Sequence, residues 1–103
     1  MEPTRNLTSD PEFVSGMLFY EYCELSHEII NEILCACARI TFKENKKESP
    51  DEDLIKGVQE KRNLALQAFR ASENFSNLES MSDVIHKFTP ILNSLLNLEK
   101  MYW

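Results

Sequence analysis

LESMSDVIHKFTPILNSLLNL, residues 78–98, carries the most regular hydrophobic pattern in the chain. Its apolar residues recur at alternating steps of three and four, the spacing of a helix that packs against another helix. One row consists of Leu78, Met81, Ile85, Phe88, Leu92 and Leu95. A second row beside it consists of Val84, Phe88, Ile91, Leu95 and Leu98. Two adjacent rows predict a helix wedged between two partners.

Pro90 interrupts this pattern without ending it. Because proline lacks a backbone donor and clashes with the preceding turn, we expect a kink near residues 86–90. The apolar spacing continues past Pro90, which favours one bent helix over two separate helices. Ser76, with Glu79 three residues later, is the predicted N-cap of this helix.

Two further segments begin with helix-start signals. Ser9 or Asp10 is the predicted N-cap of the first, with Pro11 in its first turn, and Ser49 is that of the second, followed by Pro50 and Glu52. Apolar residues follow each start at helical spacing. In the first segment this row includes Leu18, Tyr22, Leu25, Ile29, Ile33 and Ile40. Both segments are therefore predicted to be helical.

The predicted fold class is all-α. Helices over about residues 10–43, 50–72 and 77–102 predict a three-helix antiparallel bundle. We expect a flexible N-terminal arm over residues 1–8 and a single helical-bundle domain over residues 9–103. The apolar stripes are wide, so self-association or hetero-association that completes a larger bundle is a further expectation.

The net charge and the N-terminal residues argue against binding to nucleic acid, binding to anionic lipid and secretion. A formal net charge of −6 opposes binding to nucleic acid and to anionic lipid, both of which attract cationic surfaces. No stretch approaches the roughly 18–20 apolar residues of a membrane span, so no membrane insertion is expected. Residues 1–12 lack the features of a secretory signal, and we expect an intracellular protein, cytoplasmic or nuclear.

The predicted function is a non-enzymatic protein–protein interaction module, a small helical subunit or adaptor that buries apolar helix faces against a partner chain. The partner is either a second copy, giving a homodimer, or another protein in a hetero-complex. The chain ends in Met101, Tyr102 and Trp103, which either fold back onto the bundle or anchor a partner. The predicted partner-binding residues are Leu18, Tyr22, Leu25, Ile29, Ile33, Ile85, Phe88, Leu92, Leu95, Tyr102 and Trp103.

The cysteines give only weak indications of chemistry. Cys35 and Cys37 lie about 200° apart around a helix, so they cannot clasp one zinc ion and are predicted to pack in the core. Cys23 and His27 share a helix face at i and i+4, which leaves a metal-binding or redox bundle as an alternative function. A zinc site would need two more ligands, so no cofactor or metal is expected. No catalytic motif is present, and an enzyme is not expected.

A small basic patch lies at the end of the first predicted helix and in the link that follows it. Its residues are Arg39, Lys43, Lys46 and Lys47, which indicate a solvated charged linker or a contact for an acidic partner. Ser49, followed by Pro50 and acidic residues, is also a candidate phosphorylation site. A phosphate there would reinforce a helix start, so a phosphorylation-regulated binding module is a second alternative.

Overall fold

A computed structural model describes residues 11–102 of the chain, with side chains from residue 15 onward. Its three α-helices are α1 (Pro11–Asn45), α2 (Glu52–Arg70) and α3 (Leu78–Glu99). Two short 3₁₀ helices, η2 (Ser72–Phe75) and η3 (Lys100–Tyr102), follow α2 and α3. No strand occurs within residues 11–102, and the predicted all-α helical bundle is confirmed.

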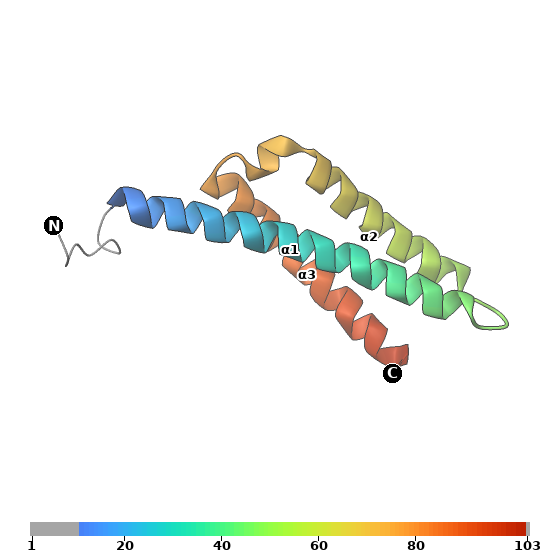
Figure 1. Ribbon diagram of the computed structural model, residues 1–103. Coiled ribbons are helices and arrows are strands. Elements are labelled where there is room, and N and C mark those ends of the chain that lie inside the picture. The colour runs from blue at the N-terminus through green and yellow to red at the C-terminus, as the bar shows by residue number, and fades with distance from the viewer. Residues whose placement is uncertain (1–10, 103) are drawn as a thin grey trace.

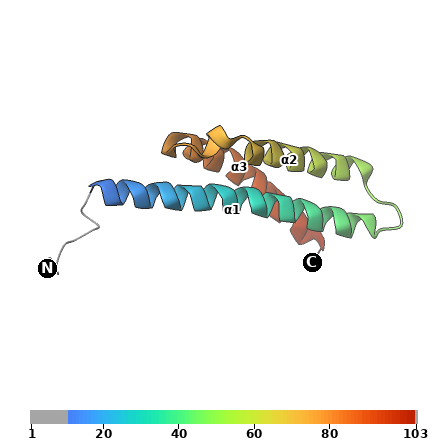
Figure 2. The ribbon, with the colours of Figure 1, turned by 45° about the horizontal axis from the view of Figure 1, so that its top comes forward.

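α1 is the longest helix and packs against both of the others. At about 1.5 Å per residue, its 35 residues span about 52 Å and the 19 residues of α2 about 28 Å. α2 runs back along the C-terminal part of α1, and α3 then crosses α1 at an angle (Figure 1). Because α2 is so much shorter, the N-terminal part of α1 continues past the turn that joins α2 to α3 (Figures 1 and 2).

The resulting shape is elongated. The principal extents are 70 × 28 × 18 Å and the radius of gyration is 18.5 Å, whereas a compact chain of this length has a radius of about 13 Å. α2 and α3 diverge from their shared turn and contact each other little (Figure 1). None of the helices found between residues 11 and 102 is long and apolar enough to cross a membrane. The predicted arm over residues 1–8 and the predicted cap at Ser9 or Asp10 lie outside the described residues.

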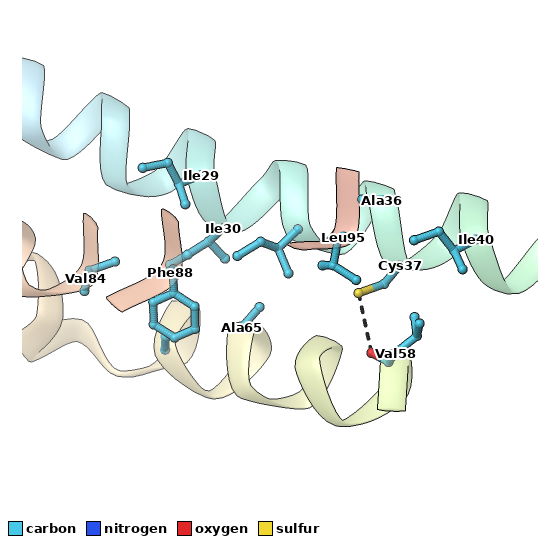
Figure 3. Close-up of a cluster of buried hydrophobic side chains, with 12 residues drawn as sticks. Ile29, Ile30, Ala36, Cys37, Ile40, Val58, Ala65, Val84, Phe88 and Leu95 are labelled. Carbon is cyan, nitrogen blue, oxygen red and sulfur yellow. Dashed lines mark hydrogen bonds between the residues drawn. The ribbon is translucent and has the colours of Figure 1, made fainter. Parts of the chain in front are cut away.

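The core lies along the C-terminal part of α1, from Ser26 onward (Figure 3). Its α1 residues follow helical spacing and are Ser26, Ile29, Ile30, Ile33, Ala36, Cys37, Ile40 and Glu44. Opposite them lie Val58, Ala65 and Ala68 of α2 and Met81, Val84, Phe88 and Leu95 of α3. Complete burial of one aliphatic side chain stabilises a fold by about 1.5–3 kcal/mol, so the isoleucines of α1 dominate this core. The small side chains of α2 let that helix approach α1 closely.

Cys35 and Cys37 differ in their surroundings. Cys37 is buried, and its Sγ donates a hydrogen bond of 3.5 Å to the carbonyl of Val58 on α2 (Figure 3). Burial raises the pKa of the Cys37 thiol. Cys35 is exposed. The predicted core packing is correct for Cys37 and wrong for Cys35, because two residues separated by about 200° cannot both face one core.

The helix starts differ from the predicted ones. Asp51 is the N-cap of α2, and its carboxylate accepts a hydrogen bond of 3.1 Å from the backbone N–H of Leu54. Asn77 is the N-cap of α3. The predicted caps Ser49 and Ser76 are wrong because Asp and Asn cap at least as well as Ser and here lie next to the first helical residue. Ser76 instead donates its hydroxyl to a carbonyl of η2.

α3 continues through Pro90 as a single helix. Pro90 itself is exposed, and the preceding Thr89 donates its hydroxyl to the carbonyl of Ile85 at 2.6 Å. Two separate helices, the disfavoured alternative, are not observed. The kink near residues 86–90 stays a prediction.

Candidate functional site

The N-terminal part of α1 lies beyond the core. No residue from Ser15 to Leu25 is buried, although Tyr22 and Cys23 are half-buried. Among the α1 side chains that the structure describes, Ser26 is the first buried one. We call residues 15–25 the projecting segment. Its N-terminal portion runs past the turn between α2 and α3 (Figure 1).

Four consecutive apolar residues of the projecting segment are exposed. The exposed fractions are 45% for Met17, 41% for Leu18, 40% for Phe19 and 64% for Tyr20. Successive residues of an α-helix lie about 100° apart, so these four side chains surround the helix axis. A helix that is apolar on all sides is normally enclosed by other protein or by lipid. The run from Met17 to Tyr20 therefore has the composition of a buried helix and the exposure of a surface helix.

The apolar row of the core passes unbroken into the projecting segment. Going toward the N-terminus from Ile29, the row continues through Leu25, Tyr22 and Leu18 at steps of four, three and four. Ile29 is buried, whereas Leu25 and Leu18 are exposed. The side chains of this row become exposed near the turn that joins the end of α2 to the start of α3, although the sequence pattern continues.

The predicted partner-binding residues fall into three environments. Leu18 and Leu25 are exposed on the projecting segment. The half-buried residues are Tyr22, Ile85, Leu92 and Tyr102. The residues buried in the chain's own core are Ile29, Ile33, Phe88 and Leu95. A partner that docks on this conformation reaches only the first two groups. Trp103 lies outside the described residues.

Cys23 and His27 share a face of α1, as their spacing predicted. The Cys23 Sγ and His27 Nδ1 atoms are 3.6 Å apart, and Nδ1 lies 2.7 Å from the Cys23 carbonyl oxygen. The imidazole stacks on Phe75 with 4.0 Å between ring centroids and meets the edge of Phe69 at 5.7 Å. Within residues 11–102, no three His, Cys, Asp or Glu side chains are grouped so as to hold a metal ion. These contacts are those of an aromatic ring packed at the end of the core.

Sequence reasoning missed a carboxylate that ties the end of α3 to α1. Glu99 is buried, and its two carboxylate oxygens accept hydrogen bonds from Arg39 at 2.6 and 3.0 Å. The Lys43 Nζ atom lies 4.0 Å from the same carboxylate. The hydrogen bond from Arg39 lowers the pKa of Glu99 despite the opposing effect of burial. Arg39 and Lys43 thus have an acidic partner inside the chain, and the solvated-linker interpretation is wrong for them.

A second buried carboxylate lies near the C-terminal end of α1. Glu44 is buried, accepts a hydrogen bond of 3.1 Å from Lys47, and accepts another of 3.2 Å from the Tyr102 hydroxyl. The hydrogen bond from Lys47 lowers the pKa of Glu44. Burial, followed by the hydrogen bond to Glu44, raises the pKa of Tyr102. Tyr102 therefore folds back onto α1, whereas its neighbour Met101 is exposed.

The sequence does contain a signal for both carboxylates. Glu44 follows the buried Ile40 by four residues, and Glu99 follows the buried Leu95 by four. A glutamate that continues an apolar row faces the same neighbouring helix as the row does. Such a position needs a cationic or hydrogen-bonding partner on that helix.

Ser49 lies in the loop between α1 and α2 and is exposed. The N-cap of α2 is Asp51, so a phosphate on Ser49 would lie two residues before the cap. Phosphorylation of Ser49 stays a prediction.

No protein-family model, curated protein sequence or solved structure matches this chain. Its function is therefore inferred from its own surface. Among the described residues, the projecting segment holds the largest run of exposed apolar side chains that are adjacent in sequence.

Proposed function

We propose that the protein is a non-enzymatic interaction module, a small helical subunit or adaptor that binds another protein chain on the projecting segment of α1. The observation that carries this proposal is the run from Met17 to Tyr20, in which every side chain is apolar and at least 40% exposed. Burying such a run against a partner removes apolar surface from water.

The residue types support a binding role. Aromatic residues and methionine are enriched in protein interfaces, and Tyr often dominates binding energy because its rigid ring buries a large area. Phe19 and Tyr20 supply two adjacent rings, and Met17 supplies a side chain that adapts to a partner's shape. The half-buried Tyr22 lies on the same segment.

Exposed apolar residues elsewhere do not form a run of sequence neighbours. Phe42 is 62% exposed, but the Lys46 ammonium lies 4.3 Å from its ring centroid. Leu64, Phe69 and Met101 are also exposed, but no two of them are adjacent in the sequence. Isolated exposures of this kind are normal in folded proteins.

A reducing compartment is part of the proposal. Cys23, Cys35 and Cys37 are all free thiols. Free thiols that are partly exposed fit the cytoplasm or the nucleus better than an oxidising compartment. We therefore place the interaction module inside the cell.

The matched pair Leu18→Ser and Leu64→Ser tests the proposal. Both leucines are exposed to nearly the same extent, 41% and 42%, but Leu18 is on the projecting segment and Leu64 is on α2. Wild-type and variant chains are tagged and used to retrieve bound proteins from native extract. We expect a stoichiometric partner to be retained by wild type and by Leu64→Ser and lost with Leu18→Ser.

Far-ultraviolet circular dichroism establishes that both variants remain folded. Retention of the same partner by Leu18→Ser would contradict the proposed site. A partner lost equally with both variants would show that its loss is not specific to the projecting segment, and it would overturn the proposal.

A further inference from the structure

On the basis of the proposed function, we propose that the partner presents a cationic amphipathic helix, whose apolar row packs on Leu18 and Leu25 and whose lysine or arginine side chains meet the glutamates beside that row. This inference names the chemistry of the occupant of the projecting segment. It depends on the distribution of charge along α1 and on the register of its acidic residues with the exposed apolar row.

Charge is segregated along α1. From Pro11 to Ala38 the sequence contains glutamate but no lysine or arginine. Glu21, Glu24 and Glu28 are exposed. The basic residues of α1 begin only at Arg39, at the opposite end of the helix.

The acidic residues are in register with the exposed apolar row. Leu18, Glu21, Leu25 and Glu28 follow one another at steps of three, four and three. Leu18 and Leu25 are therefore separated by one heptad, and so are Glu21 and Glu28, which form a parallel row beside them. A helix seated on the leucine row would carry its flanking residues directly over these glutamates.

Within the described part of the chain, no lysine or arginine pairs with these glutamates. The ion pairs found within residues 11–102 involve Glu44 and Glu99, and none involves Glu21, Glu24 or Glu28. Glu24 and Glu28 are four residues apart, a spacing at which like charges destabilise an isolated helix. The acidic row is thus unfavourable for the chain alone and becomes favourable when cations cover it.

The same charges argue against a second copy as the occupant. Two projecting segments packed together would bring two rows of glutamate side by side, with no basic residue of either segment between them. Like charges placed opposite one another at an interface oppose association. Charge complementarity therefore favours a different chain that carries basic residues.

A helix is the expected form of the partner's binding segment because the exposed row on α1 is itself helical. Leucines that repeat every seven residues accept the side chains of a facing helix between them. An amphipathic helix that places its apolar face on such a row is a common mode of peptide recognition. An extended segment would not match a seven-residue repeat.

Two synthetic amphipathic helices test the inference. They share one leucine heptad row and differ only in the flanking positions, which are lysine in one peptide and glutamate in the other. Binding of each labelled peptide to the full chain is measured by fluorescence anisotropy at low and high salt. We expect the lysine peptide to bind about tenfold more tightly at low salt, with a smaller difference at high salt because salt screens exposed charges.

Variants of the chain connect this preference to the projecting segment. The triple variant Glu21→Gln, Glu24→Gln and Glu28→Gln is expected to lose most of the preference for the lysine peptide. The double variant Leu18→Ser and Leu25→Ser is expected to lose binding of the lysine peptide. Circular dichroism confirms that each variant is folded.

A control triple variant, Glu60→Gln, Glu73→Gln and Glu79→Gln, removes the same charge from exposed positions on α2, η2 and α3. It is expected to retain the preference. A preference lost equally with this control would show that net charge alone attracts the peptide, and it would overturn the inference.

Equal binding of the two peptides would also overturn it. So would self-association of the wild-type chain in sedimentation that Leu18→Ser abolishes, since the occupant would then be a second copy. None of these results touches the proposed function, which is tested by the retention of a native partner. Loss of that partner with both Leu18→Ser and Leu64→Ser would overturn the proposed function, whatever the peptides do.

Discussion

Leu95→Ala and Leu25→Ala remove the same atoms from two different environments. Leu95 is fully buried in α3, at 0% exposure, and Leu25 on the projecting segment is 44% exposed. Truncation of a fully buried leucine to alanine costs about 2–5 kcal/mol, because apolar burial is lost and a cavity remains. At Leu25 no closed cavity forms and much of the side chain is already in water, so we expect a cost below about 1 kcal/mol.

Urea unfolding followed by far-ultraviolet circular dichroism measures both free energies of unfolding. Similar denaturant slopes for wild type and variants would establish that midpoint shifts report stability. At roughly 4–8 °C per kcal/mol for a domain of this size, Leu95→Ala should lower Tm by roughly 8 °C or more. Leu25→Ala should lower it by much less.

A loss of stability with Leu25→Ala as large as that with Leu95→Ala would refute this reasoning. It would mean that the side chain of Leu25 is enclosed within the isolated chain. The projecting segment would then be part of the chain's own core and would not be available to a partner.

Three further predictions concern the Arg39–Glu99 ion pair, the N-cap of α2 and the cysteine thiols. Because hydrogen bonding lowers the pKa of Glu99, its stabilising effect is present above the unfolded pKa of about 4.3 and is lost as pH falls through the lower folded pKa. Glu99→Gln should therefore reduce stability at pH 7 and weaken the pH dependence between pH 7 and pH 3, as measured by urea unfolding; an unchanged pH dependence would contradict this. Asp51→Ala should cost about 1 kcal/mol in the same assay because the N-cap of α2 is lost, whereas Ser49→Ala should be near neutral. A larger cost for Ser49→Ala than for Asp51→Ala would show that Ser49 is the cap. Cys35 should react quickly with a thiol reagent in the native chain and Cys37 only after unfolding, as followed by mass spectrometry; equal rates would contradict the burial of Cys37.

The helices and most of the core could be predicted from the sequence because each buried row has its own apolar spacing. Ile33, Phe88 and Leu95 lie on such rows and are buried. The wrong assignments were local. Cys35 was grouped with Cys37 by residue type, although their separation around the helix places them on different sides.

The exposed part of the apolar row could not be predicted from its pattern. Leu18, Leu25 and Ile29 belong to one continuous row, yet only Ile29 is buried. Burial depends on how far α2 and α3 extend along α1, which is a property of three helix lengths and two turns together. Nothing in the sequence of α1 indicates the residue at which α2 and α3 cease to cover it.

The distant partners of the two buried carboxylates could not be predicted for a related reason. Glu99 gains Arg39, and Glu44 gains the Tyr102 hydroxyl, only when the end of α3 crosses α1. The residues of each pair are separated by more than half of the chain. The ion pair with Arg39 follows from tertiary structure.

Site-specific photocrosslinking tests the central claim most directly. A photoreactive phenylalanine analogue replaces Phe19 on the projecting segment or, as the control, Phe42 near the other end of α1, where the ring is also exposed. After irradiation in the native source, the chain with the analogue at position 19 should form one discrete adduct with another protein, and the chain with the analogue at position 42 should not. Adducts from position 42 with none from position 19 would contradict a partner site on the projecting segment.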